Sequence, residues 1–134
     1  MVGKSAPAVG LVGSTIVAAG GLTSSGDTGD NEGYSATKNS WSDLGADPTP
    51  RQGGCAASIS GRFYFAGGSN GAPLNVVESF SAPGNKWTTL LPLPQAVVLP
   101  GSAEMNGLLY CFGGSNNGSL FQGTVYNYLQ IYQP

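Results

Sequence analysis

Three double glycines, each closing an apolar run, divide the chain into repeats. The pairs begin at Gly20, Gly67 and Gly113, which are separated by 47 and 46 residues. A fixed period of about 20–50 residues is typical of stacked folds in which no single unit buries its own faces. The 134 residues are therefore expected to form one domain, with repeats at about 1–48, 49–95 and 96–134.

An aromatic pair follows each double glycine at a nearly fixed distance. Tyr34 and Trp41 follow the first, Phe80 and Trp87 follow the second, and Tyr126 with a later Tyr132 follows the third. We interpret these residues as packing elements, because glycine permits close backbone approach and aromatic side chains fill the space between sheets. The predicted structural set is Gly20, Gly21, Tyr34, Trp41, Gly67, Gly68, Phe80, Trp87, Gly113, Gly114 and Tyr126.

Each repeat is predicted to contain four short strands. In the second repeat they cover about 54–59, 62–66, 75–81 and 86–90, with Gly- and Pro-containing turns between them. No segment has helical periodicity over even three turns. The pattern predicts an all-β fold.

These residues resemble the kelch repeat, in which a double glycine closes the second strand and an aromatic pair marks the third and fourth. Glu32 and Glu78, placed two residues before the first aromatic residue, also fit the family pattern, whereas Thr124 stands there in the third repeat. The resemblance implies a β-propeller with three four-stranded antiparallel blades. Since propellers close with about 4–8 blades, we expect a homodimer in which a second copy completes six blades.

Composition excludes several classes of function. The chain has no histidine, which removes imidazole catalysis and His-ligated metal sites, including the copper site of kelch-like radical oxidases. Five basic residues and a net charge of −2 argue against a nucleic-acid groove. No apolar run approaches the ~20 residues that cross a bilayer. We expect no cofactor, no metal, no nucleic acid and no membrane partner, and the cellular location stays open with the cytoplasm favoured.

The two cysteines are expected to be buried and reduced. Cys55 and Cys111 lie in separate apolar strand-like runs, and no CxxC spacing is present. As one belongs to a first strand and the other to the second strand of the next repeat, their Cα atoms are expected to lie beyond the ~7 Å reach of a disulfide.

A basic residue precedes the first strand of two repeats, as Lys4 and Arg51, and Val97 replaces it in the third. The kelch resemblance implies that Arg51 directs its side chain into a central pocket. A salt bridge with a nearby carboxylate is the alternative for the same residue.

Serine and asparagine follow the second and third double glycines, as Ser69, Asn70, Ser115 and Asn116. Such side chains stabilise turns by bonding to nearby backbone. If they point to one face, they form a set of neutral donors and acceptors that suits a peptide backbone or a sugar.

Two further possibilities are weaker. Asp27, Asp30 and Glu32 offer oxygens to Ca²⁺, but their spacing does not match an EF-hand loop. The charged residues near the predicted strand cores are Arg51, Arg62, Glu78 and Glu104. They include no pair of carboxylates at a recognisable catalytic spacing, so no catalytic residue is assigned.

We therefore expect a binding or scaffold module that recognises a protein, peptide or neutral polar ligand through loops on one face. The alternative is a carbohydrate-binding domain or carbohydrate-active enzyme on the same scaffold.

Overall fold

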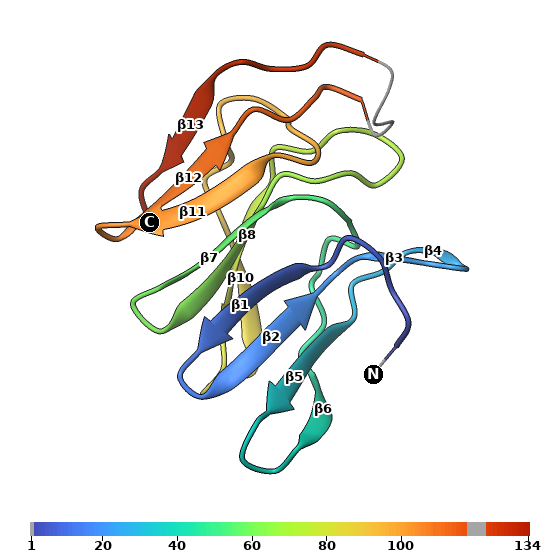
Figure 1. The fold of residues 1–134 in the computed structure, drawn as a ribbon, viewed down its shortest axis with the longest axis vertical. Helices are drawn as coiled ribbons and strands as arrows, with labels where there is room; N and C mark the ends of the chain where they lie inside the picture. Colours follow the sequence, from blue (N-terminus) through green and yellow to red (C-terminus); the bar gives the residue numbers. More distant parts are fainter. Residues whose placement is uncertain (1, 118–122) are drawn as a thin grey trace.

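Three antiparallel sheets, stacked one after another, make up the fold (Figure 1). The computed structural model describes residues 2–117 and 123–134. The sheets have the strand orders β1-β2-β5-β6, β7-β8-β9-β10 and β11-β12-β13, and a small β3–β4 hairpin projects from the first. The strands are β1 Ala8–Val12, β2 Thr15–Ala19, β3 Leu22–Thr23, β4 Gly26–Asp27, β5 Asn31–Ser35, β6 Ser40–Leu44, β7 Cys55–Ile59, β8 Arg62–Ala66, β9 Val77–Ser81, β10 Lys86–Leu90, β11 Gly101–Met105, β12 Leu108–Phe112 and β13 Leu129–Tyr132.

Each sheet is one blade of a propeller, and the blades do not close into a ring. The first strands of neighbouring blades lie against each other, β1 on β7 and β7 on β11. The predicted all-β, bladed fold is confirmed, with one difference. In the described residues the third blade has three strands and not four. None of the described segments is a helix suited to crossing a membrane.

The hydrophobic core lies between blades. Val17 of the first blade packs with Phe63, Phe65 and Phe80 of the second, all fully buried. A second cluster joins the second and third blades, with fully buried residues such as Leu109. A blade cannot bury both of its own faces, so the apolar residues of one blade are buried by the next.

Each double glycine marks the point where the next repeat enters. Gly67 and Gly68 have φ angles of 69° and 97°, which side chains rarely adopt. A Cβ at Gly67 would lie 2.8 Å from the Val97 carbonyl oxygen, and one at Gly68 would lie 2.6 Å from that of Gln52. Glycine is therefore required both by its own backbone conformation and by the close approach of these two carbonyl groups.

The third repeat differs from the predicted register. Tyr132 pairs with Leu109 as Phe80 pairs with Phe63, so Tyr132 is the aromatic residue of the third strand. Tyr126 lies in the preceding loop, where its ring centroid is 4.6 Å from that of Tyr128. The connection after the third double glycine is longer than in the other repeats, and this shifts the strand away from the expected spacing.

The expectation of two reduced cysteines is wrong. Cys55 in β7 and Cys111 in β12 are joined by a disulfide, with their Cα atoms 5.8 Å apart. Cys55 lies on the face of the second blade that packs on the third, and Cys111 lies on the facing side of the third blade. The two residues belong to different strands of neighbouring repeats, and the stacking of the second blade on the third brings them within reach of a disulfide.

Candidate functional site

One end of the sheets carries the longer connections of the chain, and we call this end the loop face. It comprises the loops between second and third strands and the segments that lead from one blade to the next, while short hairpin turns occupy the opposite end (Figure 1). The only described charged side chains on the loop face that are partly exposed are Asp27 and Asp30. Lys4, Asp47 and Arg51 also lie there, but their side chains are buried.

The serine and asparagine residues after the double glycines divide into two kinds. Ser69 and Ser115 are buried. Each forms an isolated β-bridge with the segment that precedes the first strand of its own repeat, Ser69 with Gln52 and Ser115 with Val98. We call this segment the entry segment of the repeat. The Ser115 hydroxyl also donates to the carbonyl of Asn117 at 2.6 Å. Asn70 and Asn116, which hold equivalent positions in the second and third repeats, are exposed on the loop face.

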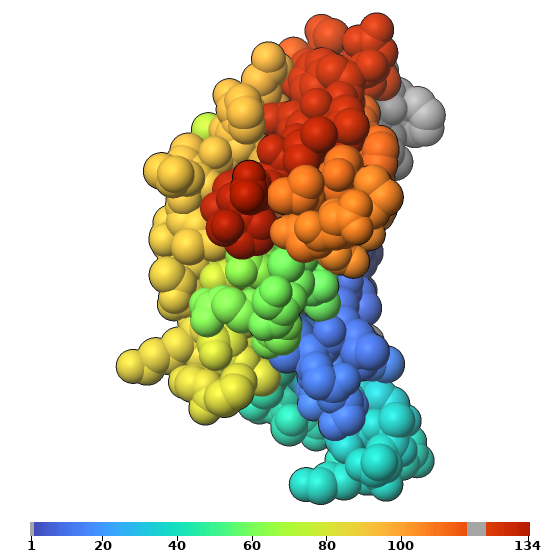
Figure 2. Space-filling model, turned by 90° about the vertical axis from the view of Figure 1, so that its left-hand side faces the viewer, coloured from blue at the N-terminus to red at the C-terminus, as the bar shows by residue number. Residues whose placement is uncertain are grey.

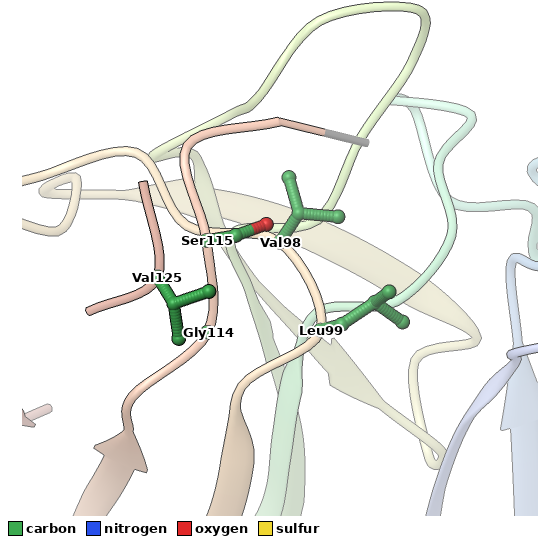
Figure 3. A pocket seen from close by; sticks show the side chains of 5 residues that line it. All are labelled: Val98, Leu99, Gly114, Ser115 and Val125. Carbon is green, nitrogen blue, oxygen red and sulfur yellow. The ribbon is translucent and has the colours of Figure 1, made fainter. Parts of the chain in front are cut away.

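A shallow pocket of about 180 Å³ opens beside the third double glycine (Figure 3). The third entry segment supplies Val98 and Leu99, and the loop after β12 supplies Gly114, Ser115 and Val125. Among the predicted ligand residues, Ser115 lines this pocket, whereas Arg51, Ser69, Asn70 and Asn116 do not.

The Arg51 side chain is fully buried between the first two blades. Its guanidinium binds the carboxylates of Glu78 at 2.7 Å and Asp47 at 3.3 Å, donates to the Phe65 carbonyl at 3.1 Å, and lies 4.1 Å from the Phe65 ring centroid. This is the salt-bridge alternative for Arg51. Its burial closes the guanidinium to a ligand.

The same arrangement is built in the first repeat around Lys4. Its ammonium binds Glu32 at 3.1 Å and donates to the Ala18 carbonyl, which is equivalent in the repeat to the carbonyl bound by Arg51. In the third repeat Gln130 stands two residues before Tyr132, the place of the two glutamates, and the basic residue is replaced by Val97. The position assigned to Thr124 thus belongs to Gln130, and acid and base are lost together.

Gln130 replaces the ion pair by neutral hydrogen bonds. Its amide accepts from the backbone N–H of Gln95 at 3.0 Å and donates to the carbonyl of the same residue at 3.2 Å. A buried carboxylate without a cation is costly. The neutral amide avoids this cost where the repeat has no basic residue.

Comparison with protein-family models matches one part of the chain. Residues 50–94 match the kelch motif. The second blade is a kelch repeat. The strand pairings, double glycines and isolated bridges of the other two blades resemble those of the second, which is consistent with a partial propeller of kelch-like blades. A comparison with curated proteins gave no match.

The kelch scaffold does not bring the remaining charged candidates together. Glu32 pairs with Lys4 in the first blade and does not join Asp27 and Asp30 as a calcium site. Glu104 is exposed, and its carboxylate accepts from the N–H of Gly107 in a hairpin turn. Arg62, at the far end of its blade, donates to the Ser79 hydroxyl.

Asp47 is a buried acid that the sequence analysis missed. It lies four residues before Arg51, and its spacing from that arginine was the available signal. Burial, followed by the hydrogen bond and charge of Glu78, raises the pKa of Asp47 to about 8. Burial also acts to raise the pKa of Glu78, but hydrogen bonding from Asp47 and the charge of Arg51 lower it overall. The raised pKa of Asp47 and the lowered pKa of Glu78 make Asp47 the favoured site of a proton in this carboxyl pair.

This protonated acid makes stability depend on pH. The pKa of Asp47 rises from its ordinary 3.8 to about 8 on folding, so between these values the folded state holds the extra proton. We expect the free energy of unfolding to fall as pH rises from about 4 to 8, by at most about 1.4 kcal/mol per pH unit. Asp47→Asn, which keeps a donor toward Glu78, should flatten this slope in urea titrations at pH 5 and 8. Asp43→Asn on exposed β6 is the control, and an unchanged slope in Asp47→Asn would contradict the assignment.

Proposed function

We propose that this kelch-type scaffold binds a protein partner through the loop face and recognises an extended peptide segment there. The observation that carries the proposal is the pair of exposed amide side chains at equivalent repeat positions, Asn70 and Asn116. An asparagine amide offers two donors and an acceptor. The Asn116 oxygen already accepts from the N–H of Thr124 at 2.8 Å, so Asn116 offers its two donors to the C=O groups of a peptide backbone. Asn70 offers two donors and an acceptor.

The electrostatics of the loop face support an uncharged recognition element. The loops 69–76 and 91–100 contain no charged residue, and Lys4 and Arg51 are neutralised by buried carboxylates. A strongly charged ligand would find no buried countercharge to bind among the described residues of these loops. A peptide backbone needs hydrogen-bond partners but no charge.

The shape of the described surface favours a peptide over a sugar or an enzyme substrate. The pocket beside Gly114 measures about 180 Å³, and a second one, beside Val2 where β5 begins and β6 ends, measures about 200 Å³. Sites that enclose small molecules usually measure about 300–1,000 Å³. A protein segment needs no enclosing pocket, because it spreads its contacts over several loops.

A pair of arrays tests the proposal. Labelled protein is applied to a peptide array and to a glycan array, and the double variant Asn70→Arg, Asn116→Arg is compared with Ser14→Arg, which lies in the turn at the opposite end. All three substitutions fall on exposed residues, where a substitution usually changes stability by no more than about 0.5 kcal/mol. We expect peptide binding that is lost in the double variant and kept in Ser14→Arg. Binding to glycans alone, or equal loss in both variants, would overturn the proposal.

A further inference from the structure

The two outer faces of the stack expose apolar side chains. On the first blade, the face turned away from the second carries a row in which β1, β2, β5 and β6 each contribute one residue: Leu11, Ile16, Tyr34 and Trp41. On the third blade, the face turned away from the second exposes Met105, Phe112, Leu129 and Ile131, which are 43–54% exposed. Figure 2 shows the blades following one another between these two ends of the stack.

Inside the chain, the same two kinds of face pack on each other. The second blade has an equivalent row across its four strands, which contains Phe63, Phe80 and Trp87. This row is buried against the first blade. In the third blade Leu109 and Tyr132 of this row are buried against the second. The aromatic rows of the second and third blades are therefore covered by the opposite face of the preceding blade.

Backbone hydrogen bonds repeat at each blade junction. The N–H of Gly53 donates to the carbonyl of Ala6 at 3.0 Å, and the N–H of Leu99 donates to the carbonyl of Gly53 at 2.7 Å. All three residues share a left-handed backbone, with φ angles of 48° for Ala6, 62° for Gly53 and 54° for Leu99. In the described residues the N–H of Ala6 and the carbonyl of Leu99 make no hydrogen bond, and they are the donor and acceptor that a third junction of this kind needs.

A second series of bonds ends in the same way. The N–H groups of Gly21 and Gly68 donate across the junction to the carbonyls of Arg51 and Val97, both at 2.8 Å. The equivalent N–H of Gly114 has no acceptor within residues 2–117 and 123–134, and the carbonyl of Lys4, equivalent to the two acceptors, has no donor there. The third blade thus ends on an unmet donor and the first begins on an unmet acceptor.

The pocket beside Gly114 lies where these bonds end. Leu99 and Gly114 both line it (Figure 3). At the equivalent places in the first and second blades, the entry segment of the following repeat sits beside the double glycine and supplies the acceptor carbonyl. The pocket therefore lies at the place that an entry segment occupies at the other two junctions.

We propose that the occupant is the segment Lys4–Ala6 of a second copy of this chain. In the assembly the N–H of Ala6 donates to Leu99 of the other copy, and the N–H of Gly114 donates to Lys4 of that copy. The third blade of each copy packs on the first blade of the other, so two identical head-to-tail junctions close the ring. Six is the one multiple of three within the about 4–8 blades with which propellers close, which fixes two copies.

The mass of the full chain in solution is the first test. Light scattering at micromolar concentration is expected to give twice the 13.5 kDa mass of one chain. A folded species with the mass of a single chain at that concentration would overturn the proposal. Open-ended polymers would overturn it as well, since they show that the junction forms without closing at six blades.

A matched pair of lysine variants locates the junction. Leu11, 58% exposed, lies on the outer face of the first blade, and Leu91, 81% exposed, follows β10 away from both outer faces. Leu11→Lys is expected to give the mass of a single chain with an unchanged circular dichroism spectrum, whereas Leu91→Lys keeps the dimer. Dimers in both variants, or monomers in both, would contradict the assigned surface.

A second substitution tests which residues face each other. At the first junction a Cβ on Gly10 would lie 2.7 Å from the Ser58 hydroxyl, and Ser58 is the equivalent of Leu11. The residue equivalent to Gly10 in the third blade is Ala103, which is exposed. Adding Ala103→Glu to Leu11→Lys places opposite charges across both junctions and is expected to restore the dimer. If the added Ala103→Glu restores no dimer in that background, the head-to-tail register is wrong.

Discussion

Arg51→Ala is expected to lower the free energy of unfolding by about 3–5 kcal/mol. The substitution removes the cation that lies 2.7 Å from Glu78 and 3.3 Å from Asp47, both buried. Breaking a buried ion pair by deleting one partner costs this much because the remaining charge is left without compensation in a low-dielectric environment. Urea denaturation at pH 7, followed by circular dichroism, measures the loss.

Two further variants separate charge from packing. Arg62→Ala removes an arginine that binds only the Ser79 hydroxyl among the described residues. It leaves a buried neutral hydroxyl and no buried charge, so it should cost about 1–3 kcal/mol, less than Arg51→Ala. Arg51→Val combined with Glu78→Gln introduces the uncharged pair of the third repeat, Val97 with Gln130. It should recover part of the stability that Arg51→Ala loses. If Arg51→Ala costs no more than Arg62→Ala, the buried pair contributes nothing to stability.

Periodicity carried most of the fold prediction because each hallmark has a local cause. The double glycines are required by left-handed backbone and by the entry segment of the next repeat, as Gly67 and Gly68 show. Phe80 and Trp87, whose ring centroids lie 5.4 Å apart, are required by the contact between blades. A residue type demanded by a repeated geometry recurs at a fixed distance, so the repeats could be predicted from spacing, and the kelch resemblance implied that each repeat is a propeller blade.

The third repeat shows where spacing fails. The connection after Gly114 is longer, so Tyr126 occupied the expected distance while Tyr132 occupied the strand. A loop changes length at little energetic cost, whereas the strand must keep its register with Leu109 to bury its aromatic side chain. Burial of Tyr132 and of Gln130 two residues earlier fixes this register, and burial is a property of the packed structure.

The candidate site was predicted only in part, for a related reason. The positions of Asn70 and Asn116 on an exposed loop follow from the double glycines before them. The role of Arg51 depends on which carboxylates the stacked blades bring to it, and these come from two places: Asp47 lies in the segment between the first two blades, and Glu78 lies in β9. A single sequence offers no measure of contacts across a blade junction.

The cysteines give the second large effect, because their disulfide joins two blades. Reduction is expected to lower the free energy of unfolding by about 4 kcal/mol, since the bond closes a loop with a sequence separation of 56 residues and long loops lose the most chain entropy when cross-linked. Urea denaturation with and without a phosphine reductant measures the change. Intact masses of the two samples should differ by two hydrogens, which verifies the state of the bond in each.

The variant Cys55→Ala, Cys111→Ala separates the cross-link from other effects of the reductant. It should unfold at lower urea than the oxidised protein and should not respond to reductant at all. Because Cys55 and Cys111 are also buried between blades, the loss of their two sulfur atoms adds a packing cost, and the variant is expected to be less stable than the reduced protein. Equal urea midpoints for the oxidised and reduced protein, with the mass difference present, would show that blade stacking alone holds β7 and β12 together.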